Sequence, residues 1–86
     1  MSDEIPVRVR VLEAWEDIVL HVAPPTRIGD LKRQALDAAR VTEPATHFLV
    51  KFRGAELRDE SRSVADERVP PDAALIVLRR RRVPVR

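Results

Sequence analysis

The chain has 86 residues and a mass of 9.8 kDa, enough for one small domain with a single core. It contains no cysteine, which excludes disulfides, thiolate metal sites and cysteine nucleophiles, and its longest apolar run, residues 73–78, is far shorter than the ~20 residues of a membrane-spanning helix. Through residue 78, nine Arg and two Lys face fourteen acidic residues, whereas residues 79–86 carry five Arg and no acid. We therefore predict an acidic domain over residues 4–80 and a basic C-terminal tail over residues 81–86.

The first four residues are acidic where a signal peptide would be basic, which predicts a cytoplasmic location. The strong preference for Arg over Lys suggests a GC-rich genome and hence a bacterial source.

Two strands are predicted first. Residues 5–12 and 18–22 alternate apolar and polar side chains, a period of two that is typical of half-buried strands. The short polar link at residues 13–17 makes them an antiparallel hairpin, which ends at Pro24 and Pro25 because proline donates no ladder hydrogen bond.

An amphipathic helix follows, with Thr26 as its expected N-cap and an end near Arg40. Lys32 is anomalous because the helical period places it inside the apolar stripe, where a lysine must reach solvent or find a carboxylate.

The remaining chain predicts a strand at 48–52, a turn at Arg53 and Gly54, and a short strand at 56–57. A long loop with room for one helical turn then leads into a last strand at 74–80. One helix on a mixed sheet of four to five strands is an α+β roll, and with the first and last strands parallel at its centre it is the β-grasp fold.

The sequence resembles the ubiquitin-like family over about residues 6–82. The similar segments are 26–32 entering the helix, 52–57 around the Arg53-Gly54 turn, 63–66, and 75–79. In this family the lysine that matches Lys32 lies partly buried beside a loop carboxylate, so the resemblance implies a structural ion pair between Lys32 and Asp59.

The chain departs from the family's conjugated members in two places. Their terminal Gly-Gly is replaced by Arg82-Val83-Pro84-Val85-Arg86, which predicts a member without the Gly-Gly tail, and the centre of the family's apolar recognition patch is Lys51.

The sheet face away from the helix is the main candidate site. Alternation places an apolar cluster there beside basic residues, which predicts a partner surface unless these are merely scattered exposed aliphatic side chains. The candidate protein-binding residues are Arg10, Leu12, Leu49, Lys51, Ile76, Leu78, Arg79, Arg80, Arg81 and Arg82. Ile76 and Leu78 are expected to contribute most to binding.

The arginine run 79–82 has three interpretations: contact with an acidic protein groove, contact with nucleic-acid phosphates, or a solvated tail. Three aromatic residues in all leave little for base stacking, so an acidic protein is the favoured partner. Trp15, at the predicted hairpin tip, is either a packing lid or a contact residue.

Nothing in the sequence predicts catalysis, a cofactor or a metal site. Gly29 and Gly54 alone cannot form a phosphate-binding loop, and His21 and His47 lie in different elements without acidic residues at ligand spacing. The leading hypothesis is a non-catalytic interaction domain that binds a larger protein, similar to small cytoplasmic components of type VII secretion systems. A modifier or sulfur carrier that requires C-terminal processing is the alternative, and a nucleic-acid-associated protein is the third.

Overall fold

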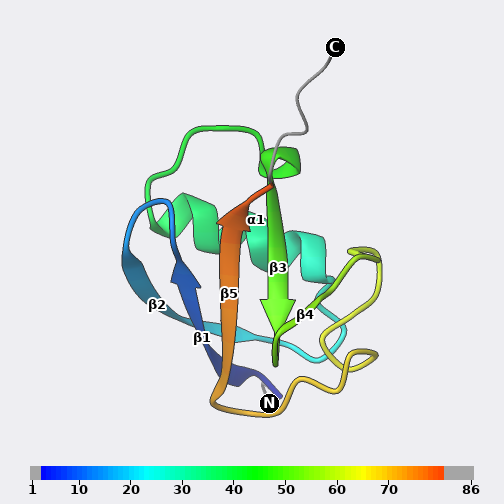
Figure 1. Ribbon diagram of the computed structural model, residues 1–86. Helices are drawn as coiled ribbons and strands as arrows, with labels where there is room; N and C mark the ends of the chain where they lie inside the picture. The colour runs from blue at the N-terminus through cyan, green and yellow to red at the C-terminus, as the bar shows by residue number, and fades with distance from the viewer. Residues whose placement is uncertain (1–2, 81–86) are drawn as a thin grey trace.

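The computed structural model describes residues 3–80, in which one α-helix packs on one face of a five-stranded sheet (Figure 1). The predicted α+β β-grasp architecture is thus confirmed. In chain order the elements are β1 Ile5–Val11, β2 Glu16–Val22, α1 Ile28–Ala38, the 3₁₀ turn η1 Ala45–His47, β3 Phe48–Phe52, β4 Ala55–Glu56 and β5 Ala73–Arg79.

The sheet has the strand order β2-β1-β5-β3-β4, so the first and last strands lie side by side at its centre. They run parallel, with Val9 opposite Leu75 and Val11 opposite Val77, whereas β1 pairs antiparallel with β2 and β3 pairs antiparallel with β5. A parallel pair needs a crossover connection, and here α1 lies within that connection and covers one face of the sheet (Figure 1).

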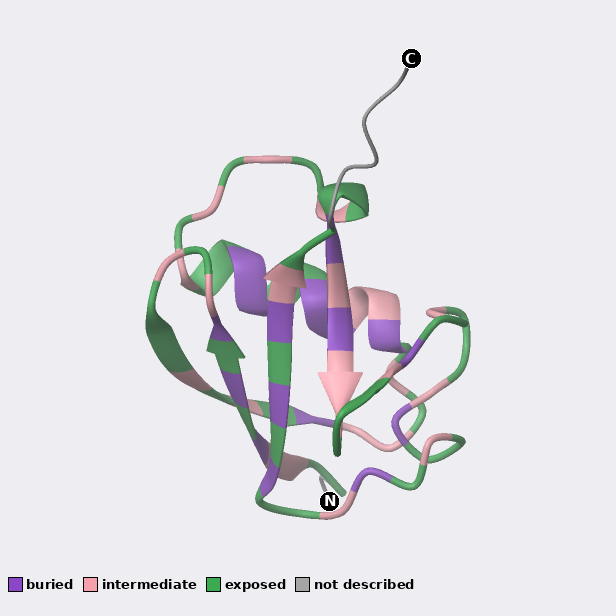
Figure 2. Ribbon diagram, in the orientation of Figure 1, coloured by how far each residue is buried: buried purple, intermediate pink, exposed green. Residues whose placement is uncertain are grey.

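The core lies between α1 and the sheet. The alternate residues of the long strands that face the helix are apolar except at two strand ends, Glu16 and Arg79, and this period of two appears along β5 as alternating buried and exposed residues (Figure 2). The largest fully buried side chains are Phe48, Ile28, Leu31, Leu75, Val7, Val9, Val11, Val22, Val50, Val64 and Val77.

The helix begins within a residue of the predicted N-cap. Its N-cap is Arg27 rather than Thr26, and no side chain caps it. The first two amide groups of the helix instead donate to the carbonyls of Arg62 and Glu60, both at 2.9 Å. The long loop between β4 and β5 therefore takes the place of a capping side chain, which sequence spacing could not reveal.

The helix ends at Ala38, two residues before the predicted Arg40. Arg40 has a φ of 61°, the left-handed conformation that reverses the chain after a helix. Its amide donates to Asp37 at 3.0 Å, and the next amide, of Val41, donates to Leu36 at 2.9 Å. These two bonds satisfy the last helical carbonyls in the pattern of a Schellman motif.

The β1–β2 loop is shorter than predicted. Residues 12–15 form the turn, and Glu16 and Asp17, expected in the loop, belong to β2 opposite Val11 and Arg10. The Arg10 guanidinium binds the Asp17 carboxylate through two hydrogen bonds, of 2.8 and 3.0 Å. This ion pair thus links β1 and β2 where their backbones are also paired, at residues whose polar character predicted a loop.

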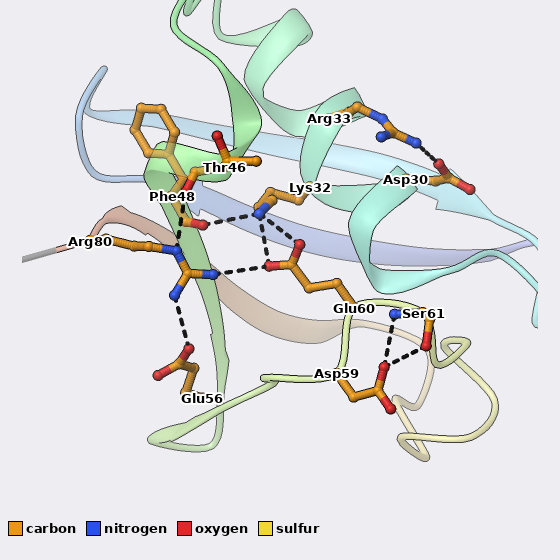
Figure 3. Close-up of polar contacts among 10 residues, drawn as sticks. All are labelled: Asp30, Lys32, Arg33, Thr46, Phe48, Glu56, Asp59, Glu60, Ser61 and Arg80. Atoms are coloured by element: carbon orange, nitrogen blue, oxygen red, sulfur yellow. Dashed lines mark hydrogen bonds and ion pairs between the residues drawn. The ribbon is translucent and has the colours of Figure 1, made fainter.

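Lys32 is buried as the helical period predicts, but its partner is Glu60 and not Asp59. The Lys32 Nζ lies 2.7 Å from the Glu60 carboxylate and donates to the Phe48 carbonyl at 3.0 Å (Figure 3). Asp59 instead accepts hydrogen bonds from the amide and hydroxyl of Ser61, which lower the pKa of its carboxyl. The local turn at Asp59 thus directs the neighbouring side chain, rather than its own, towards the helix.

We predict that Glu60→Gln lowers the free energy of unfolding by about 2 kcal/mol, because it leaves the buried Lys32 ammonium without a counter-charge. Lys32→Met should cost less, since it removes the buried charge itself. Urea denaturation at neutral pH measures both effects. Asp59→Asn is the matched control, and a loss for this variant as large as that of Glu60→Gln would contradict the pairing.

Candidate functional site

The candidate site is the sheet face opposite α1, which no other element among residues 3–80 covers (Figure 1). Ile76 lies near its centre on β5 and keeps 38% of its surface exposed, whereas its neighbours Leu75 and Val77 are buried against the helix. Leu78 is half-buried on the same outer face. As predicted, Leu75 and Val77 of β5 face the helix, and Ile76 and Leu78 face away from it.

Two cations flank Ile76. The register places Arg10 of β1 opposite Ile76 on one side and Lys51 of β3 opposite it on the other. The next outward pair along β5 is Leu78 with Leu49. The predicted residues from three strands thus form a row, in which Ile76 lies between the cations Arg10 and Lys51 and Leu78 lies beside the apolar Leu49.

Asp17 reduces the positive charge on one side of this row. Its carboxylate binds Arg10, and these hydrogen bonds hold the pKa of Asp17 below its usual range. Arg8, also exposed on the outer face, adds a further favourable charge interaction with Asp17.

Leu12 lies beside the site but not in a strand. It is the first residue of the β1–β2 turn and is half-buried, and its amide donates to the Val77 carbonyl at 3.0 Å, which extends the β1–β5 ladder by one residue.

A shallow hollow adjoins the row on the side of β2. Its lining includes Arg8, Val19, Ala74 and Ile76. Val19 is 57% exposed and was not among the predicted binding residues, although its place on the outer face follows from the alternation in β2.

Arg79 does not point freely into solvent. Its guanidinium binds Glu13 of the β1–β2 loop at 2.6 Å and also binds Glu43 of the loop after α1, and it lies 5.3 Å from the centre of the Phe48 ring. The hydrogen bonds from Arg79 lower the pKa of Glu43 to about 2. Arg79 thus joins three segments at the end of β5.

Arg80 is also held within the chain. Its guanidinium donates to the Thr46 carbonyl at 3.1 Å and lies 3.4 Å from Glu56 and 3.8 Å from Glu60 (Figure 3). Its backbone amide donates to His47 at 2.8 Å. The other two predicted arginines, Arg81 and Arg82, lie outside the described residues.

The acidic partners of these arginines are what sequence reasoning missed. The sequence assigned no partner to Glu13, Glu43 or Glu56, and only the fold brings them to the end of β5. The excess of acidic residues in the first 78 positions was the one signal in the sequence that the arginines at the end of the last strand have carboxylate partners within the chain.

Residues 3–80 contain no group of three or more potential metal ligands among His, Asp and Glu. Over the same range, no helix is long and apolar enough to cross a membrane.

We predict that the Glu43–Arg79 pair stabilises the fold at neutral pH and is lost in acid. Because the folded-state pKa of Glu43 is about 2, below its ordinary 4.5, the contribution is complete above about 4.5 and disappears as the pH falls towards 2. The urea midpoint of Glu43→Gln should therefore lie below that of the wild type at pH 7, and the gap should close through this window. Glu16→Gln is the control; a gap for Glu43→Gln that is unchanged at pH 2 would argue against the pair.

Comparison with known proteins supports the architecture. A scan against protein-family models and a search of curated proteins found no match. Among solved structures, a ubiquitin-like domain of an Arabidopsis thaliana protein is similar, with a TM-score of 0.75, 17% identity, and coverage of 88% of this chain and 77% of that one. A ubiquitin of Caldiarchaeum subterraneum is similar with a TM-score of 0.77, 13% identity, and coverage of 91% and 95%. The chain therefore has the ubiquitin-like β-grasp fold.

Proposed function

We propose that this chain is a non-catalytic interaction domain that binds a larger protein through the outer face of its sheet. The partner presents an apolar segment with acidic side chains. The observation that carries the proposal is the exposed Ile76 on a central strand, between Arg10 and Lys51.

The apolar part of the face supports binding to a protein. An isoleucine at the centre of a sheet gains nothing for folding from its exposed surface, and its outer-face neighbours Leu78 and Leu49 extend the apolar strip. Apolar side chains at the centre of a patch with polar residues around it are the arrangement found in protein–protein interfaces.

The charge of the face supports an acidic partner. Arg8, Arg10 and Lys51 outnumber the two carboxylates that the register places beside them, those of Asp17 opposite Arg10 and Glu56 opposite Lys51. A complementary acidic segment would speed association and fix its orientation.

The geometry favours a protein over nucleic acid. Phe48 is fully buried and Phe52 is half-buried, so Trp15 alone among the Phe and Trp residues of positions 3–80 offers a freely exposed ring for base stacking. Glu13, Glu16 and Asp17 flank it in sequence and would repel phosphate groups. Arg79 and Arg80 are already bound by carboxylates of this chain, which would compete with phosphate groups.

We therefore narrow the proposed contact surface. It centres on Ile76, Leu78, Leu49, Lys51 and Arg10, with Leu12 at its border, while Arg79 and Arg80 support the end of β5. The bacterial source, the cytoplasmic location and the likeness to secretion accessory subunits stay predictions.

We predict that Ile76→Asp weakens partner binding by ~30-fold or more while the domain stays folded, because it places a carboxylate at the apolar centre. Lys51→Glu should weaken binding too, by reversing a flanking charge. Affinity capture from the native host with wild-type and variant domains would identify the partner, and calorimetry with the purified partner would give the dissociation constants.

Gln34→Asp, on the exposed outer side of α1, is the matched control because it introduces the same charge away from the sheet face. Equal affinity of the wild type, Ile76→Asp and Lys51→Glu for the purified partner would refute the proposed surface.

A further inference from the structure

A second exposed apolar feature lies at the tip of the β1–β2 turn. Trp15 is 85% exposed, the highest value among the large hydrophobic residues of the described chain. The sequence left open whether it is a packing lid or a contact residue, and this exposure excludes a lid.

The backbone at Trp15 also departs from what folding alone would favour. Its φ of 55° lies in the left-handed region, where glycine or asparagine is the usual residue and a bulky side chain is unfavourable. A residue that is both strained and exposed lowers stability without a gain in packing. Arg40, Arg53, Arg68 and Asp72 also have a positive φ, so it is the combination with a highly exposed indole that distinguishes Trp15 as a candidate contact residue.

The turn is nevertheless held firmly. The Trp15 amide donates to the Leu12 carbonyl at 3.2 Å. On one side of the tryptophan Glu13 binds Arg79 at 2.6 Å, and on the other Asp17 binds Arg10 at 2.8 Å. The indole is thus presented from a fixed turn, which reduces the entropy lost when it is immobilised in a complex.

We propose that Trp15 is an anchor that inserts into an apolar pocket of a partner protein whose rim carries a basic side chain. Tryptophan is among the residues that contribute most to protein interfaces, and its indole N–H requires an acceptor in the pocket.

The charges around the β1–β2 turn indicate that the rim of the partner's pocket is basic. Glu13 and Asp17 are neutralised by arginines of this chain, whereas the Glu16 carboxylate makes no ion pair or hydrogen bond within residues 3–80. A partner cation beside the pocket would pair with Glu16 and contact the face of the indole. The unpaired Glu16 carboxylate also disfavours binding of this turn to an anionic membrane surface.

This inference is independent of the outer sheet face, because it depends on a different segment and on the opposite charge. Either surface can fail its test without affecting the other.

The test places the photo-crosslinking residue benzoylphenylalanine at position 15 in the full chain, expressed in the native host, with the same residue at position 34 as the control. The protein crosslinked at 15 but not at 34 is identified, purified and titrated with the wild type and with Trp15→Ala. We expect Trp15→Ala to bind ~30-fold more weakly. Absence of a position-specific crosslink, or equal affinity of Trp15→Ala, overturns the proposal.

Two further measurements need no crosslinking residue. Since Trp15 is the only tryptophan of the chain and there is no tyrosine, the intrinsic emission of this chain, after subtraction of the emission of the partner, reports on this side chain. It should shift to shorter wavelength with the purified partner and stay unchanged with vesicles of phosphatidylcholine and phosphatidylglycerol; a shift with vesicles overturns the assignment to a protein. Trp15→Gly should raise the urea midpoint, and a lower midpoint would show that Trp15 serves folding instead.

Discussion

The parallel pairing of β1 with β5 at the centre of the sheet is the constraint on which the rest of the structure depends. It joins the two ends of the domain and sets the register in which Val9 meets Leu75 and Arg10 meets Ile76. A shift by one residue would turn every side chain of β5 to the other face, so the burial of Leu75 and Val77 and the exposure of Ile76 are one property. The proposed binding face therefore follows directly from the packing of the core.

Ion pairs fix the segments that the apolar core does not reach. Lys32 holds the loop after β4 through Glu60, and Arg80 approaches the same carboxylate from the end of β5. Arg79 joins the β1–β2 loop to the loop after α1. Several arginines and much of the excess acid thus pair within the chain. Arg8 and Lys51, on the outer face of the sheet, are among the cations that no carboxylate of residues 3–80 binds in an ion pair.

Sequence periodicity predicted what depends on alternation: the strands, the face each residue occupies and the burial of Lys32 all follow from periods of 2 and 3.6 residues. It failed where loop conformation decides. Asp59 and Glu60 are equally plausible partners for Lys32 until a local turn at Ser61 selects one of them. The bonds of Arg79 span up to 66 residues of sequence, and the left-handed Trp15 occupies a position where sequence rules expect glycine.

The most direct test of the central claim is solvent exposure of individual methyl groups, measured by NMR with a soluble paramagnetic agent. The account predicts strong relaxation enhancement for the methyls of Ile76 and little for those of Leu75 and Val77. The reverse pattern, or equal enhancement for all three residues, would contradict the register of β5 and remove the proposed binding face.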